Sequence, residues 1–219
     1  MNHKKMVVIF DLDSTITKKD TYVAFLLSVL RCYPLRLLGT VGLPFAVVIH
    51  KLGFKDNSWL KQVFLKAIVG GLNQQQVQAC ANKFIDGLFK QGLHQQALEA
   101  IKAHQQAGHQ LVMATASFDF YSQQLGQRLG FDTIICTQSV WQGEILSGKI
   151  QGKNCYGVNK RQRLIAYFQT RQDYHIIAYS DHHSDRPFLE WVDKAIVINP
   201  TPKLQKIAQQ QHFEIQHWR

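Results

Sequence analysis

Acidic residues are scarce in this chain of 219 residues, and four of them stand where carboxylates could do chemistry. Asp11 and Asp13 follow an apolar run near the N-terminus, and Asp181 and Asp185 follow a later one. Two Asp residues spaced two apart at a strand end can direct a carboxylate and a backbone carbonyl at one point. Such oxygen ligands suit Mg²⁺, which also takes phosphate as a ligand. A single strand-end Asp is often only a cap, but two pairs favour a magnesium and phosphate site.

Hydroxyl and amine groups that could bind phosphate occur further along the chain. Thr115 and Ser117 follow the apolar run Leu111–Ala114. A hydroxyl beside the free N–H groups at a helix start is a good phosphate ligand, but Ser117 could equally cap the helix predicted from Phe118. Lys160 opens another predicted helix, where its ammonium could neutralise a phosphate oxygen. The alternative for a single Lys is a solvated surface charge.

These residues need a scaffold that brings the ends of separate strands together. Short runs rich in Val and Ile predict strands buried on both faces: Met6–Phe10, Leu111–Ala114, Thr133–Cys136, His175–Tyr179 and Ala195–Ile198. Helical patterns separate most of them: Gln95–Gln106, Phe118–Leu129, Lys160–Gln169 and Ser184–Val192. This alternation predicts an α/β fold, a Rossmann-like parallel sheet flanked by helices. Ligands of such sheets bind beyond the carboxyl ends of the strands.

Two regions interrupt the alternation of strands and helices. Residues 21–90 show no strand pattern and are predicted to form several helices, inserted as a cap after the first strand. Residues 138–152 alternate in polarity and are rich in Gly, which predicts a small β-hairpin. We therefore expect a catalytic core of residues 1–20 and 91–219, hairpin included, and a helical cap domain of residues 21–90.

The composition narrows the class of protein. A hydrophobic fraction of 46% excludes a disordered chain. Four scattered Cys residues without a CxxC pair favour a reduced, cytoplasmic protein over a disulfide or zinc framework. The net charge of +10 suits an anionic partner. We predict no secretory signal, because the first apolar run, Met6–Phe10, is short and ends directly in Asp11. We predict no membrane span, because the longest charge-free piece of the most apolar stretch, Leu37–Ile49, is short and contains Gly and Pro.

Together the polar motifs resemble those of the haloacid dehalogenase superfamily, over essentially the whole chain. The family pattern is a DxDxT motif, a hydroxyl after the next strand, a Lys opening a later helix, and an acidic loop after a further strand. In this chain these are Asp11-Leu12-Asp13-Ser14-Thr15, Thr115, Lys160 and Asp181-His182-His183-Ser184-Asp185. The chain is most similar to the subfamily IB branch, which contains phosphoserine phosphatase and phosphatidylglycerophosphatase C.

The resemblance implies a Mg²⁺-dependent phosphomonoesterase that works through an aspartyl-phosphate. It implies that Asp11 is the nucleophile and that Asp13 is the general acid and base, with its backbone carbonyl on the metal. Asp181 would be a metal ligand through its carboxylate, and Asp185 would complete and orient the metal site. The residues implied in phosphate binding are Lys160, Thr15 and Thr115, with Ser117 as the alternative to Thr115.

The sequence of the predicted cap indicates which class of phosphate ester the protein would accept as substrate. Relatives that act on phosphoserine have a Glu nine residues after the nucleophile and a cap Arg, whereas this chain has Asp20 and no Arg within Phe64–Ala67. An apolar stretch from Tyr22 to Ile49 is interrupted only by Arg31 and Arg36. Such a segment could lie on an anionic bilayer. We therefore expect a lipid phosphate such as phosphatidylglycerophosphate, and peripheral contact with the inner face of the membrane.

Other functions stay open at this point. A soluble phosphatase of the phosphoserine type, with a cap that has its own core or contacts another subunit, is the main alternative. A non-catalytic, basic nucleic-acid-binding protein is a remote one, because no basic run with interleaved aromatic residues occurs; no nucleic-acid partner is expected. We expect His182 and His183 to be solvated loop side chains; the alternative is that His182 contacts phosphate or substrate. No oligomeric state follows from the sequence.

Overall fold

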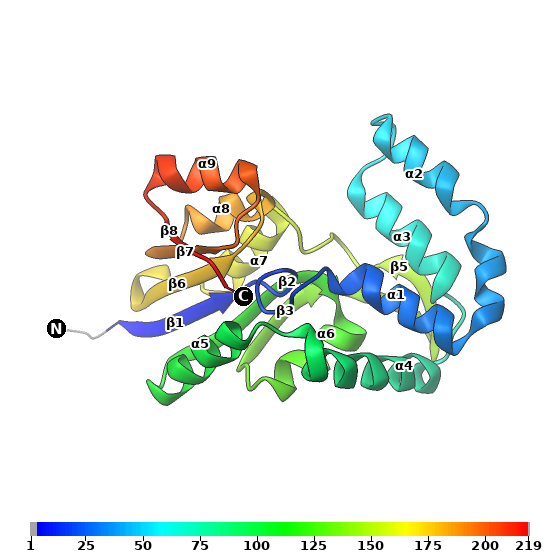
Figure 1. The fold of residues 1–219 in the computed structure, drawn as a ribbon, viewed down its shortest axis with the longest axis horizontal. Helices are drawn as coiled ribbons and strands as arrows, with labels where there is room; N and C mark the ends of the chain where they lie inside the picture. Colours follow the sequence, from blue (N-terminus) through cyan, green and yellow to red (C-terminus); the bar gives the residue numbers. More distant parts are fainter. Residues whose placement is uncertain (1–3, 219) are drawn as a thin grey trace.

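The computed structural model describes residues 4–218 and confirms the predicted α/β architecture (Figure 1). One sheet has the order β3-β2-β1-β6-β7-β8, with every neighbouring pair parallel. The strands are β1 (Lys5–Phe10), β2 (Gln110–Phe118), β3 (Thr133–Thr137), β6 (Tyr174–Ser180), β7 (Lys194–Ile198) and β8 (Glu214–Gln216). The strand order reverses beside β1, so the carboxyl ends of β1 and β6 form the switch point where such sheets bind ligands.

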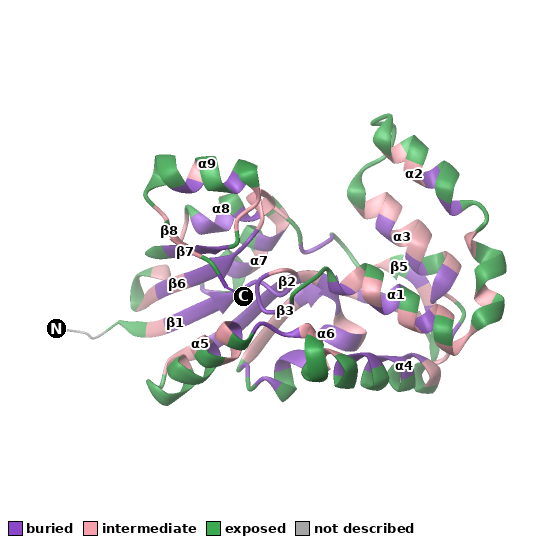
Figure 2. Ribbon diagram, viewed as in Figure 1, coloured by how far each residue is buried: buried purple, intermediate pink, exposed green. Residues whose placement is uncertain are grey.

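Helices cover both faces of this sheet because successive side chains of a buried strand point to opposite sides. Val8 and Phe10 of β1 belong to one core, and Val7 and Ile9 belong to the other. The first core includes α5 (Gln95–Gln106) and α6 (Asp119–Arg128); the second includes α7 (Val158–Tyr167), α8 (Arg186–Leu189) and α9 (Pro202–Gln211). Figure 2 shows the central strands buried along most of their length.

A helical segment lies between β1 and α5. It contains α1 (Thr21–Cys32), the 3₁₀ helix η1 (Pro34–Thr40), α2 (Leu43–Lys51), α3 (Asn57–Ile68), α4 (Gln74–Gly87) and the π-helical turn η2 (Leu88–Gly92). Side-chain caps fix two of the starts: Asp20 accepts from the Val23 N–H, and Asp56 accepts from the Trp59 N–H. The chain enters and leaves this segment side by side, because Thr17 and Leu93 form an antiparallel bridge.

The predicted hairpin is present as the antiparallel strands β4 (Ser139–Gln142) and β5 (Ile145–Ile150). It is bonded to the helical segment: the Leu146 N–H donates to the Leu72 carbonyl at 3.0 Å, and the Ile150 N–H donates to Gln62 Oε1 at 3.0 Å. Gly148 has φ 77°, and a Cβ there would lie 2.5 Å from Lys66 Cα, so only Gly allows this approach. The domain boundaries expected at residues 20 and 91 stay a prediction.

Two elements near the C-terminus differ from the prediction. The helix predicted over Ser184–Val192 is only the four residues of α8, because a 3₁₀ turn precedes it and the chain must return to β7 at Lys194. The edge strand β8 was not predicted, since three residues are too few to show a period. Within residues 4–218 no helix combines the length and apolar character needed to cross a bilayer.

Candidate active site

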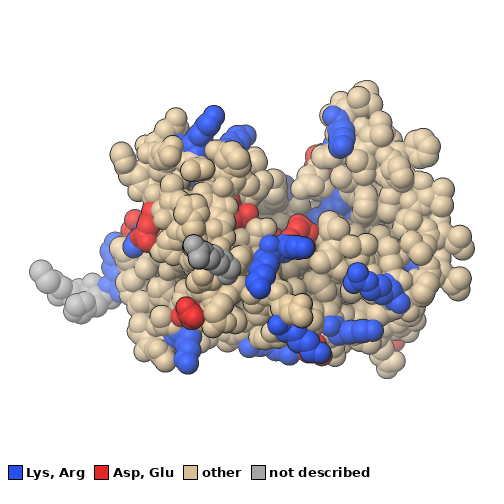
Figure 3. Space-filling view, viewed as in Figure 1, with Lys and Arg blue, Asp and Glu red and all other residues tan. Residues whose placement is uncertain are grey.

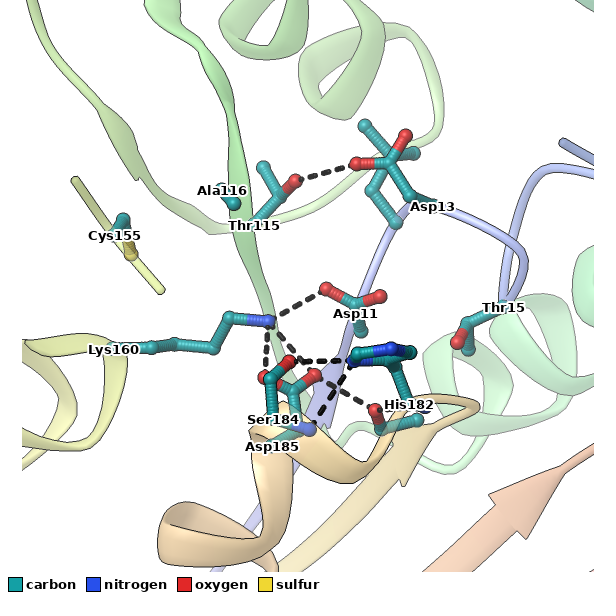
Figure 4. A network of polar contacts seen from close by, with 12 residues as sticks. Asp11, Asp13, Thr15, Thr115, Ala116, Cys155, Lys160, His182, Ser184 and Asp185 are labelled. Carbon is teal, nitrogen blue, oxygen red and sulfur yellow. Dashed lines mark hydrogen bonds and ion pairs between the residues drawn. The ribbon is translucent and has the colours of Figure 1, made fainter. Parts of the chain in front are cut away.

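The first cluster of the site joins three buried side chains from separate elements. Lys160 Nζ, on the first turn of α7, lies 2.7 Å from Asp11 Oδ1 and 2.8 and 2.9 Å from the two oxygens of Asp185 (Figure 4). Ser180 Oγ donates to Asp185 Oδ2 at 2.7 Å. Burial alone would lower the pKa of Lys160, but the carboxylates of Asp11 and Asp185 outweigh it and raise this pKa. Lys160 is therefore a fixed ammonium beside Asp11, and the alternative that it is a solvated surface charge is excluded.

The Asp13 carboxylate, in the loop after β1, is held by its own set of hydrogen bonds and not by Lys160. Asp13 Oδ1 accepts from the Thr21 N–H at 2.6 Å and from the Thr21 hydroxyl at 2.5 Å. Asp13 Oδ2 accepts from Ser117 Oγ at 2.8 Å, and Thr115 Oγ1 is 3.5 Å away. A tight turn after β1 positions this carboxylate. In the turn Ser14 has φ 58°, and the N–H groups of Ile16 and Thr17 both donate to the Leu12 carbonyl.

Of the two hydroxyls predicted to bind phosphate, Ser117 lines the cavity described below and Thr115 does not. Thr115 is fully buried and accepts from the Ser117 N–H at 2.9 Å. Strand β2 continues to Phe118 and α6 begins at Asp119, so Ser117 is not the cap of that helix. Thr115 is thus placed to support Ser117, while Ser117 and its neighbour Ala116 face the space where a phosphate would lie.

Asp181 follows β6 and completes the acidic cluster. Thr15 Oγ1 donates to Asp181 Oδ1 at 3.4 Å, so Thr15 contacts this carboxylate and does not line the cavity. Burial, followed by the charge of Asp185, raises the pKa of Asp181 to about 7. Burial also raises the pKa of Asp11 well above its usual value; Lys160 opposes this, while the neighbouring carboxylates add to it.

This excess of negative charge fits a divalent cation. Three carboxylates lie close together here: Asp11, Asp181 and Asp185. Among residues 4–218, Lys160 is the one cation that forms ion pairs within this group, with Asp11 and Asp185. Three negative charges at such short range need a further positive charge to balance them. In the described part of the chain no three carboxylate, His or Cys side chains form a ready metal cage. The Asp11 and Asp181 carboxylates lie where they could balance such a cation; their binding of metal, and that of the Asp13 backbone carbonyl, stays a prediction. Both oxygens of Asp185 contact Lys160, so its direct contact with metal stays a prediction.

These groups open into a cavity of about 380 Å³ between the sheet edge and the helical segment. Figure 3 shows the surface hollowed between these two parts of the molecule. The floor carries Asp11, Asp13, Lys160 and Asp181, and the helices supply an apolar wall: Tyr22, Val23, Leu26, Leu60 and Phe64. The volume is within the range of small-molecule sites. The site can therefore hold an organic group together with a phosphate.

Two residues of the cavity wall were not predicted from the sequence. Lys61 on α3 is 8% exposed, and its ammonium donates to the Ala116 carbonyl. Burial lowers the pKa of Lys61 to about 8, against the opposing charges of Asp13 and Asp20. His182 is half-buried, lines the cavity, and accepts from the Ser184 N–H at 3.2 Å. The prediction of a solvated side chain is thus wrong for His182, whose place in the cavity wall fits the alternative of a substrate contact. Lys61 carried no signal of its burial in the sequence.

Comparisons with known proteins agree with this geometry. A family model described as haloacid dehalogenase-like hydrolase matches residues 8–190. A probable phosphatase of Mycobacterium tuberculosis is 27% identical over 203 residues, covering 91% of this chain and 70% of that protein. Phosphoserine phosphatase SerB1 of the same organism is 24% identical over 215 residues, covering 96% and 70%.

The fold has a close counterpart among solved structures. A Bordetella pertussis protein of unknown function superposes with a TM-score of 0.82 at 21% identity, covering 97% of this chain and 98% of that one. At this identity the match establishes the architecture alone. The family model covers most of the chain, including the end of β1 with the acidic loop that follows it and the loop after β6. This chain belongs to the haloacid dehalogenase-like hydrolase family.

Proposed function

We propose that this hydrolase is a Mg²⁺-dependent phosphomonoesterase that works through an aspartyl-phosphate on Asp11. The observation that supports it is the buried group of Asp11, Asp181 and Asp185 around Lys160 at the floor of the cavity. Relatives named as phosphatases support the same reaction class. Mg²⁺, when bound, supplies positive charge that reduces the repulsion between a carboxylate nucleophile and a phosphate dianion.

The proposed reaction has two steps. In the first, an Asp11 oxygen attacks phosphorus, the bond from phosphorus to the ester oxygen breaks, and Asp13 protonates that oxygen as the alcohol leaves. In the second, Asp13 takes a proton from water as the water oxygen attacks the phosphorus of the aspartyl-phosphate. The bond from phosphorus to the Asp11 oxygen breaks, which releases inorganic phosphate and restores the Asp11 carboxylate. In this proposal Lys160 binds the phosphate oxygens beside Asp11, and a further oxygen lies near Ala116 and Ser117, which line the cavity.

Metal removal tests the reaction class. Hydrolysis of p-nitrophenyl phosphate is expected to need Mg²⁺, to disappear in EDTA, and to return when Mg²⁺ is added in excess. The reason is that the acidic cluster repels a phosphate dianion unless a cation balances it. The measurement is release of inorganic phosphate at fixed pH, with a matched EDTA–Mg²⁺ mixture as the control for chelator effects. Full activity in EDTA would contradict the proposal.

We propose a lipid phosphate, such as phosphatidylglycerophosphate, as the substrate. Apolar side chains stand exposed on η1, α2 and the loop after α2; this apolar surface consists of Leu35, Leu37, Leu38, Val41, Phe45, Val48, Ile49, Leu52 and Phe54. Leu38, Phe45 and Phe54 are 76%, 73% and 74% exposed. Residues 21–55 contain no Asp or Glu. An exposed apolar face whose charged neighbours are mostly cations is complementary to an anionic lipid bilayer. Helix α3, which packs beside α2, carries part of the cavity wall.

The cations of this surface have different roles. Arg36, expected to contact lipid, donates to the carbonyls of Ile68 and Gly70 at 3.1 and 2.7 Å and is half-buried. It thus joins η1 to the end of α3 and is not a free surface charge. Arg31, Lys51 and Lys55 are exposed and remain available for lipid phosphates. A charge-reversal test must therefore leave Arg36 in place.

Vesicle co-sedimentation tests the docking. The protein is expected to bind vesicles containing phosphatidylglycerol more strongly than pure phosphatidylcholine vesicles, and less strongly as salt rises. The double change Lys51→Glu/Lys55→Glu should weaken binding about 10- to 100-fold, since each basic residue near such a surface is worth about 1 kcal/mol. The double change Lys102→Glu/Lys206→Glu alters the same charge outside the helical segment and should have little effect. If the unmodified protein ignores anionic vesicles, docking is refuted.

A soluble substrate of the phosphoserine type is the second candidate. The phosphoserine phosphatase SerB1 relative favours it, and Asp20 lines the cavity at the place where such enzymes carry a Glu. A comparison of kcat/KM for phosphoserine and for short-chain phosphatidylglycerophosphate in neutral detergent decides between the two. A preference for phosphoserine would make the helical segment a specificity element for small metabolites.

A further inference from the structure

Two lysines enter the cavity, and their surroundings differ. Lys160 is neutralised by Asp11 and Asp185. Lys61 is nearly as buried, yet none of the ion pairs found among residues 4–218 includes it. The carboxylates of Asp13 and Asp20 act on Lys61 without forming an ion pair with it, so an anion bound directly to the ammonium would offset more of the cost of its burial.

The partners of Lys61 hold its ammonium in place without neutralising it. Nζ donates to the Ala116 carbonyl and lies 5.0 Å from the centre of the Tyr22 ring and 4.7 Å from that of Phe118. The Tyr22 hydroxyl donates to the Lys61 carbonyl at 2.6 Å, which fixes the ring against α3. Aromatic faces and one carbonyl offset part of the desolvation of an ammonium, and they leave N–H donors for a ligand.

The position of Lys61 relates it to the leaving group of the substrate. Its partner Ala116 directly precedes Ser117, whose hydroxyl bonds to Asp13, the proposed acid for the leaving oxygen. Lys61 therefore lies on the Asp13 side of the cavity, whereas Lys160 is bonded to Asp11. The cavity is also lined by apolar side chains of α1 and α3 around Lys61, so an organic group extending from the phosphate would pass along it.

We propose that Lys61 binds a second anionic group, a carboxylate or a phosphodiester, carried by the leaving group of the substrate. This inference rests on the proposed phosphatase function. It makes the cavity selective for phosphate esters with two anionic groups, and Lys61 a specificity-determining residue. The alternative is that Lys61 only ties α3 to the end of β2, in which case it would have no preference among esters.

A matched series of glycerol phosphates tests this. Glycerol 3-phosphate has no second anion, 3-phosphoglycerate adds a carboxylate, and short-chain phosphatidylglycerophosphate in neutral detergent adds a phosphodiester. Affinities are measured by calorimetry with Mg²⁺ in the Asp11→Asn background, where hydrolysis is not expected, so that the result does not depend on turnover. Turnover of the same esters by the protein with Asp11 intact separately tests the proposed function.

Lys61→Met, which removes the charge and keeps an unbranched side chain, should lower the preference for the doubly anionic ester over glycerol 3-phosphate by about 10- to 100-fold. Lys61→Arg should restore part of this preference, and Lys66→Met, at an exposed Lys of the same helix, should leave it unchanged. The ester with the larger loss identifies the second anion. An unchanged preference in a Lys61→Met protein that melts like the parent, or no preference in the parent, would overturn the inference.

Discussion

Asp11→Asn is expected to abolish phosphate-ester hydrolysis, with a loss on the order of 10⁴-fold or more, since it removes the proposed nucleophile. The fold should survive. Asn can still accept a hydrogen bond from Lys160, which keeps its contact with Asp185. Removing one of several buried, neighbouring carboxylates also relieves repulsion. We therefore expect a melting temperature equal to or above that of the unmodified protein, measured together with phosphate release.

The control for this change is Asp173→Asn, at an exposed Asp in the 3₁₀ turn that precedes β6. It makes the same chemical replacement outside the cavity and should leave kcat/KM unchanged. Mass spectrometry of the Asp11→Asn protein excludes deamidation back to Asp, which would return some activity. Substantial hydrolysis by an Asp11→Asn protein free of such deamidation would mean that water attacks the ester directly and that no aspartyl-phosphate forms.

Asp13→Asn is expected to lower kcat about 10²- to 10⁴-fold for alkyl phosphates, the range typical of a lost general acid. Asn can accept from the Thr21 N–H through its oxygen and donate to Ser117 Oγ through its amide. The turn should therefore persist, and with it the backbone carbonyl proposed as a metal ligand. Binding of inorganic phosphate in the presence of Mg²⁺, measured by calorimetry, should be largely retained.

The leaving group provides the sharper test of Asp13. p-Nitrophenol leaves without needing a proton, so the first step should be less affected with p-nitrophenyl phosphate than with glycerol 3-phosphate. The second step still lacks its base, so rapid mixing should show a burst of p-nitrophenol close to one per active site. An Asp13→Asn protein that hydrolyses glycerol 3-phosphate at the original rate would refute the assignment of Asp13 as general acid.

Much of the scaffold could be predicted from local sequence alone. Buried strands of a parallel sheet are short apolar runs, so β1, β2, β3, β6 and β7 were each recognised within a few residues. Their alternation with helices indicated the class of fold, and the placement of Asp11 and Asp181 at strand ends predicted that they would meet. The short edge strand β8 could not be predicted, because its three residues carry no period and pair only with β7.

The floor of the site follows from local sequence, since the positions of Asp11, Asp13 and Asp181 depend on where strands end. The walls depend on tertiary packing. Whether Lys61 is a surface charge or a buried cation depends on which face of α3 meets the end of β2, and Arg36 became a structural residue only where η1 approaches the end of α3. Contacts between segments distant in the chain depend on packing geometry, which no local pattern of residues encodes.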